Sequence, residues 1–297
     1  MSPVAFASGQ LDAFLAAAAS TGRPGLPAFP TDLPEPLHFA SYELTRSESA
    51  LLARRVQRAG FAVVDVTEEP TEQNLTALAA RLGLGDPFVP PIYRRPGAVT
   101  VASSGVSTLT ATADGVAHPA VSANGQGLHV DGLLQPIGTV RTSVLLCARP
   151  AAQGGVSTLF NSTAAFWALV GEDPQAAETL MGSGVLTRTA SVNGSTDQAT
   201  GPAFAVVDGQ LLTRYSRDGN DTWTPAPGQD AALDRALEAM DAMAQPGSPY
   251  AAELTLAAGQ GLVFANSRLC HGRTVYLDDP AAPRRMLRGL FTRDTAA

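Results

Sequence analysis

The sequence predicts a mainly β protein with flanking helices, in the sandwich or jelly-roll class. Stretches with strand character outnumber stretches with helical spacing along the chain. The 297 residues can bury one large core, and no internal repeat divides them. With 45% hydrophobic and 16% charged residues, the composition is typical of a folded globular chain. We therefore expect one large β domain.

The N-terminal part of the chain is expected to carry a helix. Residues 1–40 are rich in Ala and Pro, which predicts a helix followed by a coil that packs on the core. Asp12, together with the lack of a basic segment before it, argues against a signal peptide. Residues 41–297 are expected to form the single domain.

The first elements of that domain follow from local signals. Helical apolar spacing with an acidic residue in the first turn predicts a helix over 47–59, and Gly60 ends it. The apolar run 61–66 predicts a buried strand, and a second helix is expected over 71–82. The further expected helices are 162–170 and 229–244, and the further expected strands are 98–103, 139–148, 155–160, 184–190, 203–207, 210–215, 251–257, 261–265 and 286–293.

Two long insertions interrupt these elements, near 92–126 and near 188–230. The first is polar, rich in Gly, Ser and Ala, and runs directly into His129. Long loops inside a compact domain often cover a binding site. Both insertions are therefore expected to be lid-like.

Composition excludes several kinds of function. The net charge is −7 and all 20 basic residues are arginine, so a lysine Schiff base or lysine general base is excluded. An acidic chain without a basic run is not expected to bind nucleic acid, and no apolar run approaches the roughly 18 residues of a membrane span. The two cysteines, Cys147 and Cys270, lie in apolar contexts, which favours a reduced cytoplasmic protein. A homo-oligomer is left open.

Two histidines and one acid predict a metal site. His129 and Asp131 are two residues apart, so their side chains point to the same side if this segment ends a strand. His271 would complete the set from a distant strand. Two imidazoles and one carboxylate hold a non-haem Fe(II) on one face and leave the other open for a cosubstrate and dioxygen. The remaining histidines, His38 and His118, lie in proline-containing stretches and are expected at the surface.

Several segments, taken in order and spacing, give the chain a family resemblance. They are Leu-His-Val-Asp-Gly at 128–132, Val-Leu-Leu-Cys-Ala-Arg-Pro at 144–150, Gly-Gly-Val-Ser-Thr-Leu-Phe at 154–160, Gly-Leu-Val-Phe-Ala-Asn at 261–266, Cys-His-Gly-Arg-Thr at 270–274 and the basic strand 284–293. Over residues 60–295 the chain resembles the Fe(II)/2-oxoglutarate oxygenases of the taurine dioxygenase and clavaminate synthase superfamily. The resemblance implies a double-stranded β-helix, which is a form of jelly roll.

The resemblance also implies cofactors and the residues that bind them. His129, Asp131 and His271 would be the ligands of Fe(II), and dioxygen would react there. Thr158 and one nearby arginine would bind the distal carboxylate of the cosubstrate 2-oxoglutarate.

Three arginines compete for that role: Arg284, Arg285 and Arg288. Strand alternation sends Arg284 and Arg288 to one face and Arg285 to the other. In clavaminate-type relatives the first of two arginines four apart binds 2-oxoglutarate, whereas in taurine dioxygenase-like relatives the second does. We favour Arg284, and keep Arg288 for 2-oxoglutarate or for an acidic group of the substrate.

The implied activity is hydroxylation, desaturation or cyclisation at an unactivated carbon of a small molecule. An amino acid, a small peptide or a natural-product intermediate is the expected substrate. Relatives that halogenate have a small residue in place of the acid, so Asp131 argues against chlorination. Two alternatives come from other classes: a metal-dependent jelly-roll hydrolase or isomerase, and a non-catalytic β-sandwich binding module.

Overall fold

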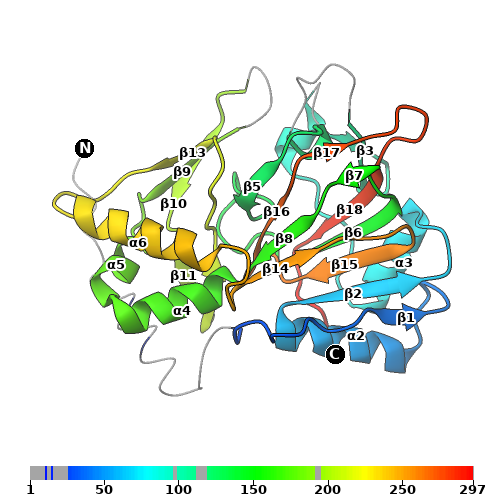
Figure 1. Cartoon of the computed structure of the whole chain (residues 1–297), viewed down its shortest axis with the longest axis horizontal. Helices are drawn as coiled ribbons and strands as arrows, with labels where there is room; N and C mark the ends of the chain where they lie inside the picture. The colour runs from blue at the N-terminus through cyan, green and yellow to red at the C-terminus, as the bar shows by residue number, and fades with distance from the viewer. Residues whose placement is uncertain are drawn as a thin grey trace.

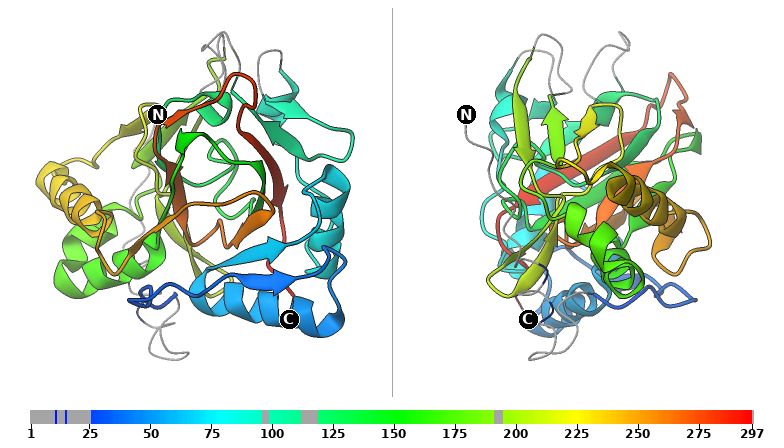
Figure 2. Two further views of the ribbon diagram at one scale, coloured as in Figure 1. Left: turned by 45° about the vertical axis from the view of Figure 1, so that its right-hand side comes forward. Right: turned by 90° about the vertical axis from the view of Figure 1, so that its left-hand side faces the viewer.

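Two β-sheets face each other and enclose a common interior (Figure 1, Figure 2). The computed structural model describes residues 11, 15, 26–95, 99–111, 119–190 and 195–296. The large sheet has the order β1 (Leu37–Phe39), β2 (Phe61–Val66), β15 (Gln260–Phe264), β6 (Thr142–Arg149), β18 (Arg285–Phe291), β4 (Ser107–Leu109) and β3 (Thr100–Val101). The small sheet has the order β14 (Ala251–Leu254), β8 (Ser157–Phe160), β16 (Cys270–Arg273) and β5 (Gln126–His129). A separate pair joins β7 (Gln153–Gly154) to β17 (Tyr276–Leu277).

Strand β2 shows why the central strands of the large sheet have nearly continuous apolar sequences. Phe61 and Val63 point into the interior between the sheets, while Ala62 and Val64 point outward and are buried beneath helices. Because both faces are covered, five of the six residues of β2 are apolar, and Asp65 is the exception. Neighbouring β15 repeats the pattern, with Val63 opposite Leu262 in the antiparallel register.

Helices α2 (Arg46–Ala59) and α3 (Glu72–Arg81) cover the outer face of the large sheet (Figure 1). Thr45 begins α2 with a capping box, in which its side chain accepts from the backbone N–H of Glu48 and the Glu48 carboxylate accepts from the backbone N–H of Thr45. Gly60 ends the helix at φ 84°, a conformation that favours glycine. Leu52 and Leu75 are among the buried side chains that pack against the sheet.

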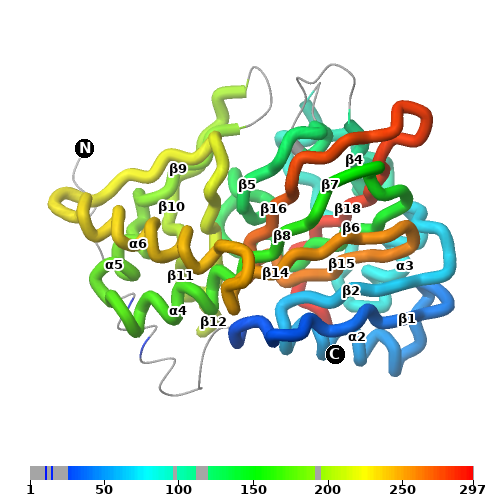
Figure 3. Tube along the Cα trace, in the orientation of Figure 1, coloured from blue at the N-terminus to red at the C-terminus, as the bar shows by residue number. Residues whose placement is uncertain are grey.

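A second group of elements flanks the two sheets (Figure 3). It contains α4 (Ser162–Glu172), α5 (Pro174–Thr179), α6 (Asp230–Met243), β9 (Leu186–Thr189), β10 (Gln198–Gly201), β11 (Phe204–Val207), β12 (Gln210–Thr213) and β13 (Asp221–Trp223). Its core is aromatic, with Phe166 and Phe204 stacked at 4.3 Å between ring centroids. Residues 188–230 therefore carry strands of their own.

The other insertion, 92–126, is also partly structured. It contains most of the 3-10 helix η1 (Pro91–Arg94), the strands β3 and β4, and a second 3-10 helix η2 (Pro119–Val121). Strand β4 pairs with β18 and so belongs to the large sheet. Residues 112–118 of this insertion lie outside the described residues.

The predicted fold class is confirmed, and the predicted helices over 47–59, 71–82, 162–170 and 229–244 are all present. The sequence missed α5 and the short strands β1, β4, β7, β10, β13 and β17, whereas β5 and β16 were expected only as strands carrying His129 and His271, without bounds. The expected N-terminal helix lies outside the described residues except Leu11 and Leu15, which are helical. Leu26 and Phe29, in the coil that follows, are buried against the core. None of the helices in the described part of the chain has the length and apolar character of a membrane span.

Candidate active site

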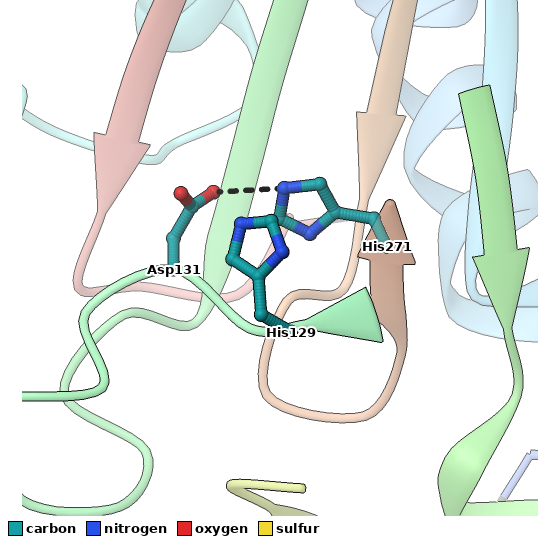
Figure 4. A group of neighbouring side chains, drawn as sticks. All are labelled: His129, Asp131 and His271. Carbon is teal, nitrogen blue, oxygen red and sulfur yellow. Dashed lines mark ion pairs between the residues drawn. The ribbon is translucent and has the colours of Figure 1, made fainter. Parts of the chain in front are cut away.

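The two histidines of the predicted metal site face each other across paired strands. His129 is the last residue of β5, and His271 lies in β16, directly opposite it in the antiparallel register. Their ring centroids are 4.2 Å apart (Figure 4). Strand pairing therefore brings together two residues that are 142 positions apart in the chain.

Asp131 reaches the same point from the turn after β5. A side-chain amide holds its backbone: Asp131 N–H donates to Asn266 Oδ1 at 2.8 Å, and Asn266 Nδ2 donates to the Asp131 carbonyl at 3.2 Å. Asn266 Nδ2 also donates to the carbonyl of Val140 at 3.0 Å. The ligand atoms of His129, Asp131 and His271 all lie within 4.8 Å of one another.

The protonation states of these residues suit a metal ion, because metal ligands must be deprotonated. Burial lowers the pKa of His271 to about 3, so its ring is neutral at neutral pH. Burial also lowers the pKa of His129, against the opposing effect of Asp131. Burial would raise the pKa of Asp131, but Arg288 and the two histidines outweigh it and lower the pKa to about 2.

One ring nitrogen of His129 is left for a ligand. Nδ1 lies 2.9 Å from the carbonyl oxygen of Gly127, which can only accept, so Nδ1 carries the proton. Nε2 then carries the lone pair and accepts from the Gln126 amide at 3.1 Å. The residues present thus fit the set of two imidazoles and one carboxylate that binds non-haem iron.

Both carboxylate oxygens of Asp131 have partners. Oδ1 accepts from Arg288 Nη1 at 2.9 Å, and Oδ2 accepts from the Ser143 hydroxyl at 2.7 Å. Oδ2 also lies 3.8 Å from His271 Nε2 (Figure 4). Arg288 Nη2 in turn donates to the Tyr93 hydroxyl at 2.6 Å. Arg288 therefore contacts the acid of the metal set directly, and Ser143, Tyr93 and Asn266 are site residues that sequence reasoning missed.

A second cavity, which His271 also lines, contains the arginines predicted to bind 2-oxoglutarate. Arg284 and Arg288 both line it, whereas Arg285 is exposed. Arg284 is buried, at 8% exposed, although a register shift between Arg285 and Met286 interrupts the pairing of β18. The two arginines four residues apart therefore share one face, as strand alternation predicted.

The structure does not bring Thr158 to this cavity. Its neighbour Ser157 lines the cavity, and Thr158 lines a different one on the outer side of the small sheet. Thr158 lies opposite Gly272, where an added Cβ would come within 2.8 Å of the Thr158 hydroxyl. Adjacent side chains in a strand point to opposite faces, and the sequence does not show which of two neighbouring hydroxyl residues faces inward.

A further cavity opens beside the metal set, on the side of the two insertions. Tyr93, Gln126, Gln135, Arg188 and Arg288 contribute its polar wall, together with His129 and Asp131. Arg188 is buried, and its Nη1 lies 2.6 Å from Asp218 Oδ1 and 3.1 Å from Asp221 Oδ1. Nothing in the local sequence marked Arg188, because its carboxylate partners lie about thirty positions along the chain.

The chain matches the family model described as "Taurine catabolism dioxygenase TauD, TfdA family" over residues 26–290. The chain belongs to this family. Two relatives are named uridine-5′-phosphate dioxygenase. The one from Amycolatopsis sp is 38% identical over 259 residues, covering 86% of this chain and 92% of the relative. The one from Streptomyces sp is 39% identical over 244 residues, covering 78% of this chain and 85% of the relative.

Solved structures agree with the fold. Asparagine oxygenase in complex with Fe(II), 2S,3S-3-hydroxyasparagine and succinate has a TM-score of 0.61 at 17% identity, over 83% of this chain and 79% of that one. The non-haem iron oxygenase OrfP in complex with Fe and α-ketoglutaric acid has a TM-score of 0.61 at 15% identity, over 98% and 92%. A taurine dioxygenase from Burkholderia xenovorans has a TM-score of 0.58 at 16% identity, over 90% and 88%.

The TauD/TfdA assignment decides between the classes left open by the sequence. The protein is an Fe(II)- and 2-oxoglutarate-dependent dioxygenase that acts on a small molecule. The jelly-roll fold expected for this family is the one observed. The alternatives of a hydrolase or isomerase, and of a non-catalytic binding module, are therefore set aside.

Proposed function

We propose that this dioxygenase oxidises a nucleoside 5′-phosphate, with uridine 5′-phosphate as the first candidate. The observation that carries the substrate class is the likeness, over most of both chains, to two relatives named for that nucleotide. Arg188 and Arg288 also line the cavity beside the metal set, but both are already paired with aspartates, so the substrate class rests on the relatives. A nucleotide thus takes the place of the amino acid or peptide that the sequence alone suggested.

We propose His129, Asp131 and His271 as the ligands of the iron. With 2-oxoglutarate and dioxygen, the bound iron supplies the oxidant for an unactivated C–H bond. Asn266 holds the backbone of Asp131, while Ser143 and Arg288 each bind one of its carboxylate oxygens. These contacts orient the acid before the metal binds, which is the usual role of groups around metal ligands.

We propose Arg284 as the arginine that binds the distal carboxylate of 2-oxoglutarate, with Ser157 in place of Thr158 as the hydroxyl partner. Both line the cavity that adjoins His271. Arg288 is less suited to this role, because its two terminal nitrogens already contact Asp131 and Tyr93. An arginine suits the contact because its planar fork can donate two parallel hydrogen bonds to one carboxylate.

The two insertions are proposed to cover the substrate. Ile92 and Tyr93 from the first and Arg188 from the second line the cavity beside the metal set. Arg95 joins the insertions, since its Nη1 donates to the Ser195 hydroxyl at 2.7 Å and its Nη2 lies 2.7 Å from Asp197 Oδ2. Closing this side of the site would exclude water from the oxidation.

We propose hydroxylation in preference to halogenation. With iron bound, Asp131 would serve as the ligand whose absence allows a halide to bind, and Arg288 and Ser143 both donate hydrogen bonds to its carboxylate. Turning this carboxylate away would break two buried hydrogen bonds.

Succinate formation from 2-oxoglutarate tests the substrate class. The purified protein with Fe(II) and ascorbate would be given uridine 5′-phosphate, uridine, and a panel of amino acids and cyclic dipeptides. We expect succinate formation to exceed the substrate-free rate with the nucleotide, together with an oxidised nucleotide in the mass spectrum. Uridine is the matched control, because it differs only by the phosphate. A faster rate with an amino acid or dipeptide than with any nucleotide would overturn the proposal.

A further inference from the structure

Three buried arginines line the cavity that adjoins His271: Arg288, which is paired with Asp131, and two others. Arg273 and Arg284 are 9% and 8% exposed, and neither forms an ion pair with a carboxylate among the described residues. Their guanidinium carbons lie 4.4 Å and 5.1 Å from the ring centroid of Tyr276. Two positively charged guanidinium groups therefore lie close together beside one aromatic ring. Their mutual repulsion in the interior is unfavourable unless an anion binds between them.

The charges around the cavity indicate the charge of the ligand that it would bind. The nearby carboxylate is Asp278, whose Oδ1 accepts from the backbone N–H of Arg284 at 2.9 Å. Arg288, the third arginine in the cavity wall, is paired with Asp131, so the charge of Asp278 is balanced by Arg284 alone. Arg273 adds one positive charge, so the cavity matches one further carboxylate.

Strand register directs Arg273 into this cavity. Arg273 pairs with Ser157 across β16 and β8, and His271 pairs with Leu159 two positions away. Positions two apart in a strand share a face, so Arg273 lies on the same face as His271. All four of these residues line the cavity.

Backbone carbonyls fix the guanidinium of Arg273 and leave one of its terminal nitrogens available to a ligand. Nη2 donates to the carbonyl of Ser122 at 2.8 Å and to the carbonyl of Asn124 at 2.7 Å. Nη1 is buried and has no hydrogen-bond partner among the described residues. An arginine guanidinium is always charged at neutral pH. A buried charged donor without an acceptor is unfavourable, and a ligand oxygen would satisfy it.

We infer that Arg273 is a second arginine for the distal carboxylate of 2-oxoglutarate, donating through Nη1 beside Arg284 and Ser157. This inference rests on the proposed assignment of the cavity to 2-oxoglutarate. Arg273 then makes the enzyme select 2-oxo acids that carry a carboxylate at the far end. It acts by binding and positioning the cosubstrate, and takes no part in the chemistry at the iron.

A pair of ligands isolates this contact. 2-Oxoglutarate and 2-oxopentanoate have the same carbon chain, but 2-oxopentanoate lacks the distal carboxylate. Binding of each to the Fe(II)-loaded protein without oxygen would be measured by calorimetry, so that no turnover is needed. Arg273→Gln should weaken 2-oxoglutarate roughly ten- to a hundred-fold and leave 2-oxopentanoate unchanged, as expected for loss of a charge-assisted contact.

Three further variants make every outcome informative. Arg273→Lys keeps the charge without the fork, so it should recover part of the 2-oxoglutarate affinity. Arg285→Gln is the matched control, because Arg285 is an exposed arginine of the same region and should bind both acids normally. If Arg273→Gln and Arg273→Lys weaken both acids equally, Arg273 merely supports the loop at Ser122 and the inference is wrong. If Arg284→Gln also leaves 2-oxoglutarate binding unchanged, the proposed cosubstrate cavity itself is wrong.

Discussion

The ion pair between Asp131 and Arg288 predicts a change in stability that can be separated from catalysis. The two side chains are 2% and 4% exposed, and their nearest charged atoms are 2.9 Å apart. Asp131→Ala would leave the Arg288 charge in the interior with the Tyr93 hydroxyl as its described hydrogen-bond acceptor. It would also leave the Ser143 hydroxyl without its acceptor. The substitution should therefore destabilise the metal-free protein as well as abolish turnover.

The size of the effect follows from the cost of a buried, uncompensated charge. Removing one partner of a buried ion pair typically costs about 3–5 kcal/mol. In a protein of this size each 1 kcal/mol lowers Tm by roughly 2–4 °C. The metal-free Asp131→Ala protein should therefore melt roughly 6–20 °C below the parent.

A double-mutant cycle in thermal denaturation is the assay. Arg288→Met removes the uncompensated charge and retains an apolar stem, so Asp131→Ala with Arg288→Met should recover much of the loss. Asp131→Asn, which keeps the shape and an acceptor oxygen, should lose less than Asp131→Ala. If the two single losses simply add in the double variant, Arg288 and Asp131 are not coupled and the reasoning fails.

Three other substitutions test separate parts of the site. Arg284→Gln should raise the 2-oxoglutarate concentration needed for turnover tens- to thousands-fold. The concentration of the prime substrate needed for turnover should change little. If Arg288→Gln alone loses 2-oxoglutarate binding, or Arg284→Gln affects only the prime substrate, the roles of Arg284 and Arg288 are reversed. Asn266→Ala should weaken metal binding roughly ten- to a hundred-fold in a competitive titration, and unchanged affinity would remove Asn266 from the site. Burial would raise the pKa of Asp218, but Arg188 outweighs burial and lowers the pKa. The ionised Asp218 therefore stabilises the folded protein above about pH 4, and this stabilisation is lost as the pH falls further. Denaturation against pH should show a shallower loss on the acid side for Asp218→Asn, and identical slopes would contradict this.

Local signals accounted for the elements that have strong periodicity or clear ends. Helix α2 was expected because of its apolar spacing and the glycine at 60, and its first residue differs by one from the expected start. Strand β2 was placed at its observed bounds because both of its faces are buried. Strand β16 carries no such pattern, since Cys-His-Gly-Arg has neither β-branched residues nor apolar alternation. It is a strand because β5 and β8 pair with it on both sides.

In the candidate site too, some features were evident from the sequence and others depend on tertiary contacts. The identities of His129, Asp131 and His271 were evident because few histidines are available and their spacing resembles a known pattern. The contacts of Asp131 with Ser143, Asn266 and Arg288 were not evident, because they depend on how β6, β15 and β18 come to lie beside the turn after β5. Thr158 was named because of the resemblance alone; the strand register, which places Ser157 at the cavity instead, is not visible in the sequence, and a shift of one residue exchanges the two faces.

The register of β16 links the metal to the cosubstrate. His271 and Arg273 are two positions apart on one face of the strand, so their Cα atoms are separated by roughly 7 Å. Gly272, between them, allows Thr158 and the backbone of β5 to approach, where an added Cβ would lie 2.9 Å from the Gln126 carbonyl. If His271 binds the iron and Arg273 the distal carboxylate, this one strand sets the distance between the two ends of 2-oxoglutarate. Any substitution at Gly272 that displaces β16 should therefore weaken iron and cosubstrate together, whereas substitutions at Arg273 or Arg284 should weaken the cosubstrate alone.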